Sequence, residues 1–189
     1  MARRRYYRRS VRVVAARKKW ATCMNAGAIT ATGSASSTSP TPPIVVHGED
    51  ILVRNSAQAS TPTPVVVKAG NFKIQGDCVL RVTGGVKDTS SVIVYIMYLP
   101  EVVVTSANPV TTINDHPEWI MGWKLIDLNS SSTSPGNTNS FSFSSRLKRN
   151  LNSGDTIALV AVLRDATPTT AAEYSIRLNY NAQWWTCSN

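Results

Sequence analysis

The sequence predicts an all-β protein: an eight-stranded jelly roll of two packed antiparallel sheets, behind a basic N-terminal arm that is disordered when alone. Short apolar runs rich in Val, Ile and Thr favour strands. Turn residues recur between these runs at intervals typical of sandwiches and barrels. The longest apolar run, Val92–Leu99, has eight residues, which suits a strand and is too short to span a membrane.

The positive charge of the protein is concentrated in its arm. Nine of the first twenty residues are basic and none is acidic, whereas the remainder holds 11 basic and 11 acidic residues, so the net charge of +9 lies in this segment. Like charges and a shortage of apolar groups prevent such a run from folding alone. Charge gathered in one tail indicates a polyanionic partner.

Aromatic residues among the arginines favour single-stranded nucleic acid as that partner. The planar guanidinium group suits phosphate, and an aromatic ring that stacks on an unpaired base contributes roughly 1–3 kcal/mol. A nuclear-localisation signal is a compatible second role, while a mitochondrial transit peptide and a solvated tail remain alternatives. In the arm, residues 1–25, the predicted nucleic-acid-binding residues are Arg3, Arg4, Arg5, Tyr6, Tyr7, Arg8, Arg9, Arg12, Arg17, Lys18, Lys19 and Trp20.

A tether is predicted next. Ala26–Pro43 carries no charge and is rich in Ser, Thr, Gly and Pro, a composition that indicates an extended linker. The folded domain is therefore expected to begin near Ile44 and to occupy residues 44–189. Leu128–Ser140 is expected to be a polar surface loop.

Eight strands are expected in the domain. Eight antiparallel strands in about 145 residues suit a jelly roll, and an immunoglobulin-like sandwich with seven or nine strands is the structural alternative. The predicted strands are Val45–Asn55, Val65–Gln75, Cys78–Thr83, Ser91–Leu99, Glu118–Asp127, Phe141–Leu147, Thr156–Leu163 and Glu173–Tyr180.

The sequence carries no pattern of a catalytic or metal site. There are two histidines, and no CxxC, HExxH, GxGxxG or phosphate-binding loop. Three cysteines, Cys23, Cys78 and Cys187, do not form a disulfide framework, and Cys78 is expected to be a buried small apolar residue. We therefore expect no enzyme activity, no cofactor and no metal.

Two tryptophan pairs bear on assembly. Trp119 and Trp123 share a strand face by their spacing, so at least one is expected in the core between the sheets, with a subunit contact as the alternative. Trp184 and Trp185 are adjacent and must point to opposite faces of a strand. One of the two is hard to bury in a monomer, and this pair is the predicted subunit interface, with a tryptophan pair lying flat under a neighbouring loop as the alternative.

A second basic cluster lies in SRLKRN. Arg146 and Lys148 share a face if the strand continues, and Arg149 is expected to begin a turn. The three residues are further candidates for contact with nucleic acid, and a solvated strand end is an equal alternative.

Together these features resemble a known family. The opening MARRRYYRR and the segments VKAGNFKIQGD, VIVYIMYLPE, HPEWIMGWK and FSFSSRLKRNLNSGDTIAL are similar to capsid proteins of circovirus-like, circular single-stranded DNA viruses. The resemblance implies a viral jelly roll that assembles with itself into a small icosahedral shell of about sixty copies. It also implies that the arms face inward and bind packaged single-stranded DNA without reading its sequence.

The same resemblance implies a location in the virion and, during assembly, in the host nucleus. The arm would then also engage a nuclear import receptor, and the shell an unidentified host receptor. The resemblance alone favours DNA over RNA, so the coat protein of a small single-stranded RNA virus is the nearest alternative. A cellular nucleic-acid-binding β module, and a β-sandwich enzyme or lectin with a targeting peptide, are weaker ones.

Overall fold

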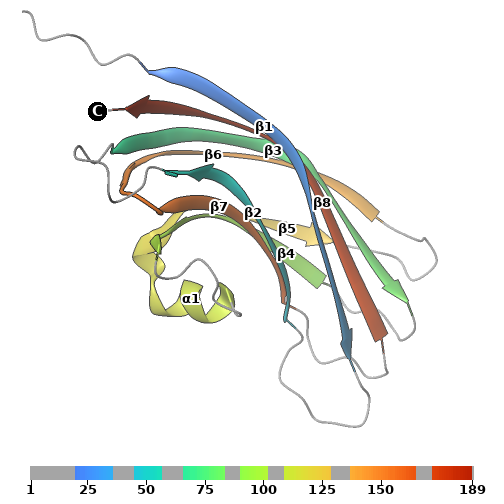
Figure 1. Ribbon diagram of the computed structural model, residues 1–189. Coiled ribbons are helices and arrows are strands. Elements are labelled where there is room, and N and C mark those ends of the chain that lie inside the picture. Colours follow the sequence, from blue (N-terminus) through green and yellow to red (C-terminus); the bar gives the residue numbers. More distant parts are fainter. Residues whose placement is uncertain are drawn as a thin grey trace, which may run out of the picture.

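Two four-stranded sheets face each other (Figure 1). The computed structural model describes residues 20–35, 45–56, 66–83, 90–101, 109–128, 137–164 and 172–188, and the structural statements below concern these. We call β1-β8-β3-β6 the first sheet and β2-β7-β4-β5 the second sheet. The strands are β1 (Ala21–Ala35), β2 (Val45–Arg54), β3 (Val67–Thr83), β4 (Ser90–Leu99), β5 (Ile120–Leu128), β6 (Asn137–Leu151), β7 (Thr156–Arg164) and β8 (Ala172–Ser188).

The order of the strands defines the fold. Every paired neighbour is antiparallel, and the chain passes from one sheet to the other at each connection except that between β4 and β5. This is the double-sheet arrangement of an eight-stranded jelly roll. The predicted fold class is therefore confirmed.

The main core lies between the sheets, and a smaller cluster lies outside the second sheet. Alternate residues of β8, such as Ile176 and Leu178, are buried against the second sheet. The outer cluster includes Met97 and Val160 and is covered by Ile113 of helix α1 (Pro109–Asp115) (Figure 1). The central strands β4 and β7 are thus buried on both faces, which explains their nearly continuous apolar sequences.

The folded domain begins earlier than expected. The tether predicted over Ala26–Pro43 is wrong in its first part, because Ala21–Ala35 forms β1 and pairs along β8 to Ala172. Small residues give this strand a weak alternation, yet Ile29 is buried at an inward position. Pairing with β8 supplies the hydrogen bonds that the composition does not reveal. Residues 36–44 lie outside the described part.

Two further boundaries differ from the prediction. From Val67 onward, the predicted strands Val65–Gln75 and Cys78–Thr83 form one strand, β3, which carries a bulge where Asn71 has a φ of 54°. The strand β6 begins at Asn137, so the end of the expected loop Leu128–Ser140 is strand, and residues 129–136 are not described. In the described part of the chain, no helix is long and apolar enough to cross a membrane.

Candidate nucleic-acid interface

The arm meets the domain at Trp20. The predicted binding residues from Arg3 to Lys19 lie outside the described residues, and Trp20 directly precedes β1. The Lys148 Nζ atom lies 5.2 Å from the centroid of the Trp20 ring, in cation–π geometry. Since β1 and β6 are the two edges of the first sheet, this contact spans the width of that sheet. The structure thereby brings the last predicted binding residue of the arm, Trp20, to Lys148 of the second basic cluster.

A glycine makes room for this contact. Thr22, Trp185, Gly70 and Lys148 form one cross-strand row over the four strands of the first sheet. A Cβ atom on Gly70 would lie 2.5 Å from Lys148 Cγ, so the lysine side chain runs over the place where a side chain would stand. Gly70 was not among the predicted site residues. A glycine within a strand pattern, which marks close approach of another group, was the available signal.

Two of the three predicted β6 cations lie together. The strand continues to Leu151, so Arg146 and Lys148 share the outer face of the first sheet and both are exposed. The sequence predicted that Arg149 begins a turn, and this prediction is wrong. Arg149 lies within the strand and points to the opposite face. The structure therefore separates Arg149 from its two neighbours.

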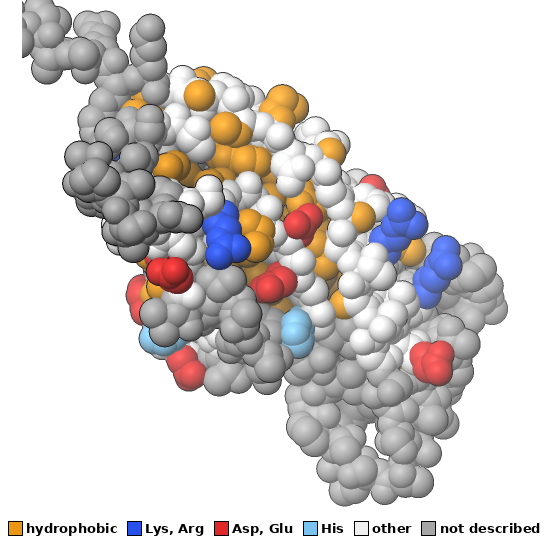
Figure 2. Space-filling model, viewed as in Figure 1, with side chains coloured by type: hydrophobic (Ala, Val, Ile, Leu, Met, Phe, Trp, Pro, Cys, Tyr) orange, Lys and Arg blue, Asp and Glu red, His pale blue; other side chains and the backbone are white. Residues whose placement is uncertain are grey.

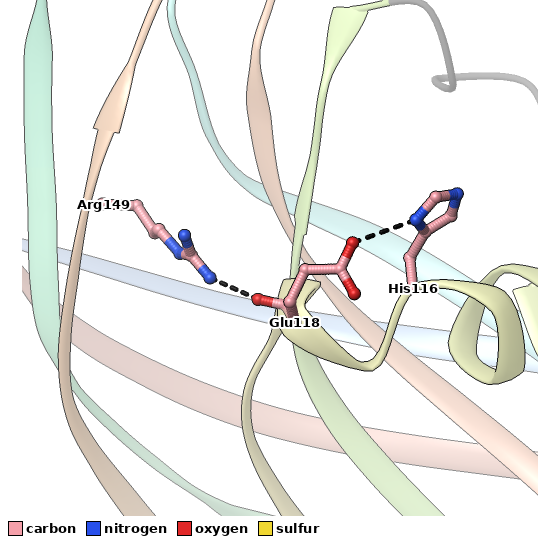
Figure 3. A network of polar contacts seen from close by, with 3 residues as sticks. All are labelled: His116, Glu118 and Arg149. Atoms are coloured by element: carbon pink, nitrogen blue, oxygen red, sulfur yellow. Dashed lines mark hydrogen bonds and ion pairs between the residues drawn. The ribbon is translucent and has the colours of Figure 1, made fainter.

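Arg149 makes contacts within the domain instead. Its guanidinium group donates a hydrogen bond to the backbone carbonyl of Glu118 (Figure 3). It also lies 5.5 Å from the centroid of the Tyr98 ring. These contacts join β6 to the second sheet and to the short 3₁₀ helix η2 (Pro117–Trp119).

The partners of Arg149 continue the network. His116 Nδ1 lies 3.0 Å from Glu118 Oε1 (Figure 3), and the His116 ring stacks on Trp119. The backbone N–H of Glu118 and the His116 side chain together lower the pKa of the Glu118 carboxyl group. Tyr98 donates a hydrogen bond of 2.8 Å to Asp155. Burial, as the larger cause, and this hydrogen bond together raise the pKa of Tyr98 to about 12.

The terminal tryptophans point to opposite faces of β8, as predicted. Trp184 is 6% exposed and stacks on Phe72 in the main core. It is therefore not available to a second subunit, contrary to its inclusion in the predicted interface. Trp185 is 38% exposed on the outer face of the first sheet, and its role in subunit contact stays a prediction.

The prediction for the other tryptophan pair is wrong. Neither Trp119 nor Trp123 lies between the sheets: Trp119 packs against the outer cluster and His116, and Trp123 is 61% exposed. The edge strand β5 directs Met121 and Ile126 into the main core instead. Trp123 and Leu125, which is 41% exposed, form an apolar pair on the outer face of the second sheet.

Cys78 is not placed to react as a thiolate. Cys78 is buried, as predicted. Burial raises the pKa of the Cys78 thiol to about 12, so the thiol stays protonated at neutral pH. Among the residues that the structure describes, no group of three or more His, Cys, Asp or Glu side chains is placed to hold a metal ion.

Comparison with known proteins adds little to this geometry. No family model matches the chain, and no curated protein matches its sequence. Among solved structures, one similar chain is the capsid protein in the crystal structure of a decameric BFDV capsid protein. The two sequences are 12% identical, the alignment covers 88% of this chain and 99% of that chain, and the TM-score is 0.32. The jelly-roll assignment rests on the strand order rather than on this likeness.

Proposed function

We propose that this protein is the structural subunit of a small icosahedral viral shell, and that its basic arm packages single-stranded DNA without reading its sequence. The observation that carries the proposal is the contact between Trp20 and Lys148. It supports a route by which the arm joins the domain on the same face as Arg146 and Lys148. Arm and domain would then present one continuous basic surface to the nucleic acid.

The arm acts by charge and stacking. A shell of about sixty copies brings about 540 positive charges to its interior, enough to neutralise a large part of a genome of a few thousand nucleotides. Trp20 and the arm tyrosines Tyr6 and Tyr7 stack on unpaired bases. Neither interaction distinguishes one base from another, so packaging depends on single-stranded character and charge. No enzyme activity or cofactor enters this mechanism.

Self-assembly in this proposal uses exposed apolar side chains on both sheets. Exposed large apolar side chains mark contact surfaces in proteins. Trp123 and Leu125 on the second sheet are exposed in the isolated chain, and Trp185 is a further candidate. In this proposal the protein resides in the virion. It passes through the host nucleus during assembly, where an import receptor recognises the arm.

Electron microscopy of the purified protein at low salt tests the proposal. We expect closed shells of uniform diameter whose ratio of absorbance at 260 and 280 nm shows packaged nucleic acid. Nuclease digestion of the released cargo identifies it, and RNA that resists DNase would transfer the proposal to an RNA virus. A small species that stays small when single-stranded DNA is added would refute the shell function.

A further inference from the structure

The two outer faces of the domain differ in charge. Since residues alternate along a strand, register and burial assign each side chain to a face. Among the residues of the second sheet whose side-chain burial is described, the outer face carries one basic residue, Arg54, and two acidic ones, Glu49 and Asp127. The described charged residues on the outer face of the first sheet are six basic and two acidic: Lys68, Lys73, Arg81, Arg146, Lys148, Arg177, Asp77 and Glu173.

Of the two acidic residues on the first sheet, one is hydrogen-bonded to a neighbouring amide and the other lies away from the middle of the face. Asn179 donates a hydrogen bond of 2.8 Å to Asp77, and Arg177 donates one of 3.2 Å to Asn179. Glu173 lies near the beginning of β8, eight residues before Asn181. The middle of this face therefore carries the cation Lys73 among uncharged polar groups. In Figure 2, the charged side chains on the visible side of the domain are few and separate, among uncharged polar and apolar groups.

A depression of about 470 Å³ lies in the middle of this face. Its volume falls in the range of sites for small molecules. All four strands contribute side chains to it, among them Met24, Lys73, Gln75, Ser144, Asn181 and Gln183. Met24 is 75% exposed, so the depression is open to solvent.

The lining matches the chemistry of a nucleotide. Each side-chain amide of Gln75, Asn181 and Gln183 can donate and accept hydrogen bonds, as the edge of an unpaired base requires. The Met24 thioether is a flexible apolar group that contacts aromatic rings favourably. Lys73 supplies a cation at the same depression for a backbone phosphate.

The depression lies on a path along β8. At one end of the face, Lys148 contacts Trp20, where the arm joins the domain, and Trp185 lies in the same cross-strand row as Lys148. Towards the other end, a second depression of about 290 Å³ is lined by Arg81 and Arg177. Eight residues of β8 separate Trp185 from Arg177, a distance of about 26 Å at about 3.3 Å per residue, which accommodates a few nucleotides.

We propose that the outer face of the first sheet binds single-stranded nucleic acid alongside the arm. An unpaired base occupies the depression between Met24 and Asn181, and backbone phosphates meet Lys73 and Arg177. The inference rests on the proposed function, because it concerns the same ligand, and it assigns part of the binding to residues of the folded domain.

The test measures binding of a fluorescent oligothymidylate to the full chain over a series of salt concentrations. The variant K73Q/R177Q removes two charges from the proposed face, and R54Q/K124Q removes two exposed charges from the strands of the second sheet. Each lost phosphate contact lowers the slope of log K against log salt by about 0.7. We therefore expect K73Q/R177Q to reduce the slope by about 1.4, and R54Q/K124Q to leave it unchanged.

A second measurement addresses the base. We expect Met24→Ser to lower the preference of the full chain for oligothymidylate over an abasic strand of equal length, with an unchanged melting temperature. Equal salt slopes for the two charge variants, or an unchanged preference in Met24→Ser, would overturn the inference while leaving binding through the arm intact. Failure of the unmodified chain to bind either strand would instead overturn the proposed function.

Discussion

Replacement of Gly70 by alanine tests how the arm is attached to the domain. A Cβ atom at this position would lie 2.5 Å from Lys148 Cγ, and also 2.7 Å from the backbone oxygen of Leu147 and 2.9 Å from Lys148 Cα. Two of these three atoms belong to the backbone of β6, so a change of side-chain rotamer cannot relieve the whole overlap. The neighbouring edge strand must move.

The expected cost follows from this geometry. Inserting a methyl group into a filled space costs about 1–3 kcal/mol. In a domain of this size each kcal/mol lowers the melting temperature by about 2–4 °C, so Gly70→Ala should melt about 2–12 °C below the unmodified protein. Without an obstruction, alanine in a strand would stabilise by restricting the unfolded chain. A lower melting temperature of Gly70→Ala therefore indicates the obstruction, and a higher one indicates its absence.

Two further variants separate the causes. Gly122→Ala is the matched control, because its Cβ atom would meet Ser145 Cβ at 3.1 Å and no backbone atom more closely, so its cost should be smaller. Lys148→Ala in the Gly70→Ala background removes Cγ and should recover part of the loss. A double-mutant cycle should give a coupling of at least about 0.5 kcal/mol. If Gly70→Ala is as stable as the unmodified protein, or the two changes are additive, Lys148 does not cross the sheet at Gly70.

Three other predictions concern the arm, the Tyr98 network and assembly. Deletion of residues 1–19 should leave the melting temperature unchanged because β1 begins at Ala21, and it should lower the salt slope of DNA binding; a deletion variant that is unfolded by circular dichroism would contradict this. The pKa of Tyr98 rises from 10.0 to about 12 on folding. The protonated phenol therefore stabilises the folded state below pH 10, and this contribution is lost as pH rises towards 12. In denaturant titrations between pH 10 and 12, Tyr98→Phe should lose less stability than the unmodified protein. Trp123→Ser should change the melting temperature little, because the side chain is 61% exposed, but it should reduce the yield of shells by size-exclusion chromatography, and an unchanged yield would exclude Trp123 from the subunit contacts.

The number of strands was predicted correctly, but two errors offset each other. β1 was missed because its alternating residues are mostly Ala, Gly and Thr, and small residues give little contrast between inward and outward positions. β3 was divided in two because Gly76 and Asp77 form a turn-like pair. In the structure Gly76 lies instead inside the sheet, where a Cβ atom would be 2.0 Å from the backbone oxygen of Asn179. In both β1 and β3, pairing with neighbouring strands determines that the segment is a continuous strand. The sequence of the segment itself does not show which strands lie beside it.

The tryptophans show a related limit. Adjacent positions determine that Trp184 and Trp185 face opposite ways, and the structure agrees. Which of the two is buried depends on Phe72 of another strand, against which Trp184 packs. For Trp119 and Trp123, the spacing was read as one strand, whereas the first belongs to η2 and the second to β5. Both tryptophans nevertheless lie on the outer side of the second sheet. Their spacing indicated a shared side, but it did not indicate which side of the sheet is packed between the two sheets.

The charge of the first sheet depends on a single irregularity. Before the bulge in β3 the outward residues are even-numbered, as in Lys68, and after it they are odd-numbered, as in Lys73 and Arg81. A strand without the bulge would keep one parity and direct either Lys68 or the later two into the core, where an unpaired charge is costly. Asn71, with its φ of 54°, is a residue type that tolerates the left-handed conformation at this bulge. The bulge therefore places all three cations on the face that the arm joins at Trp20, although the composition of the domain shows no net charge.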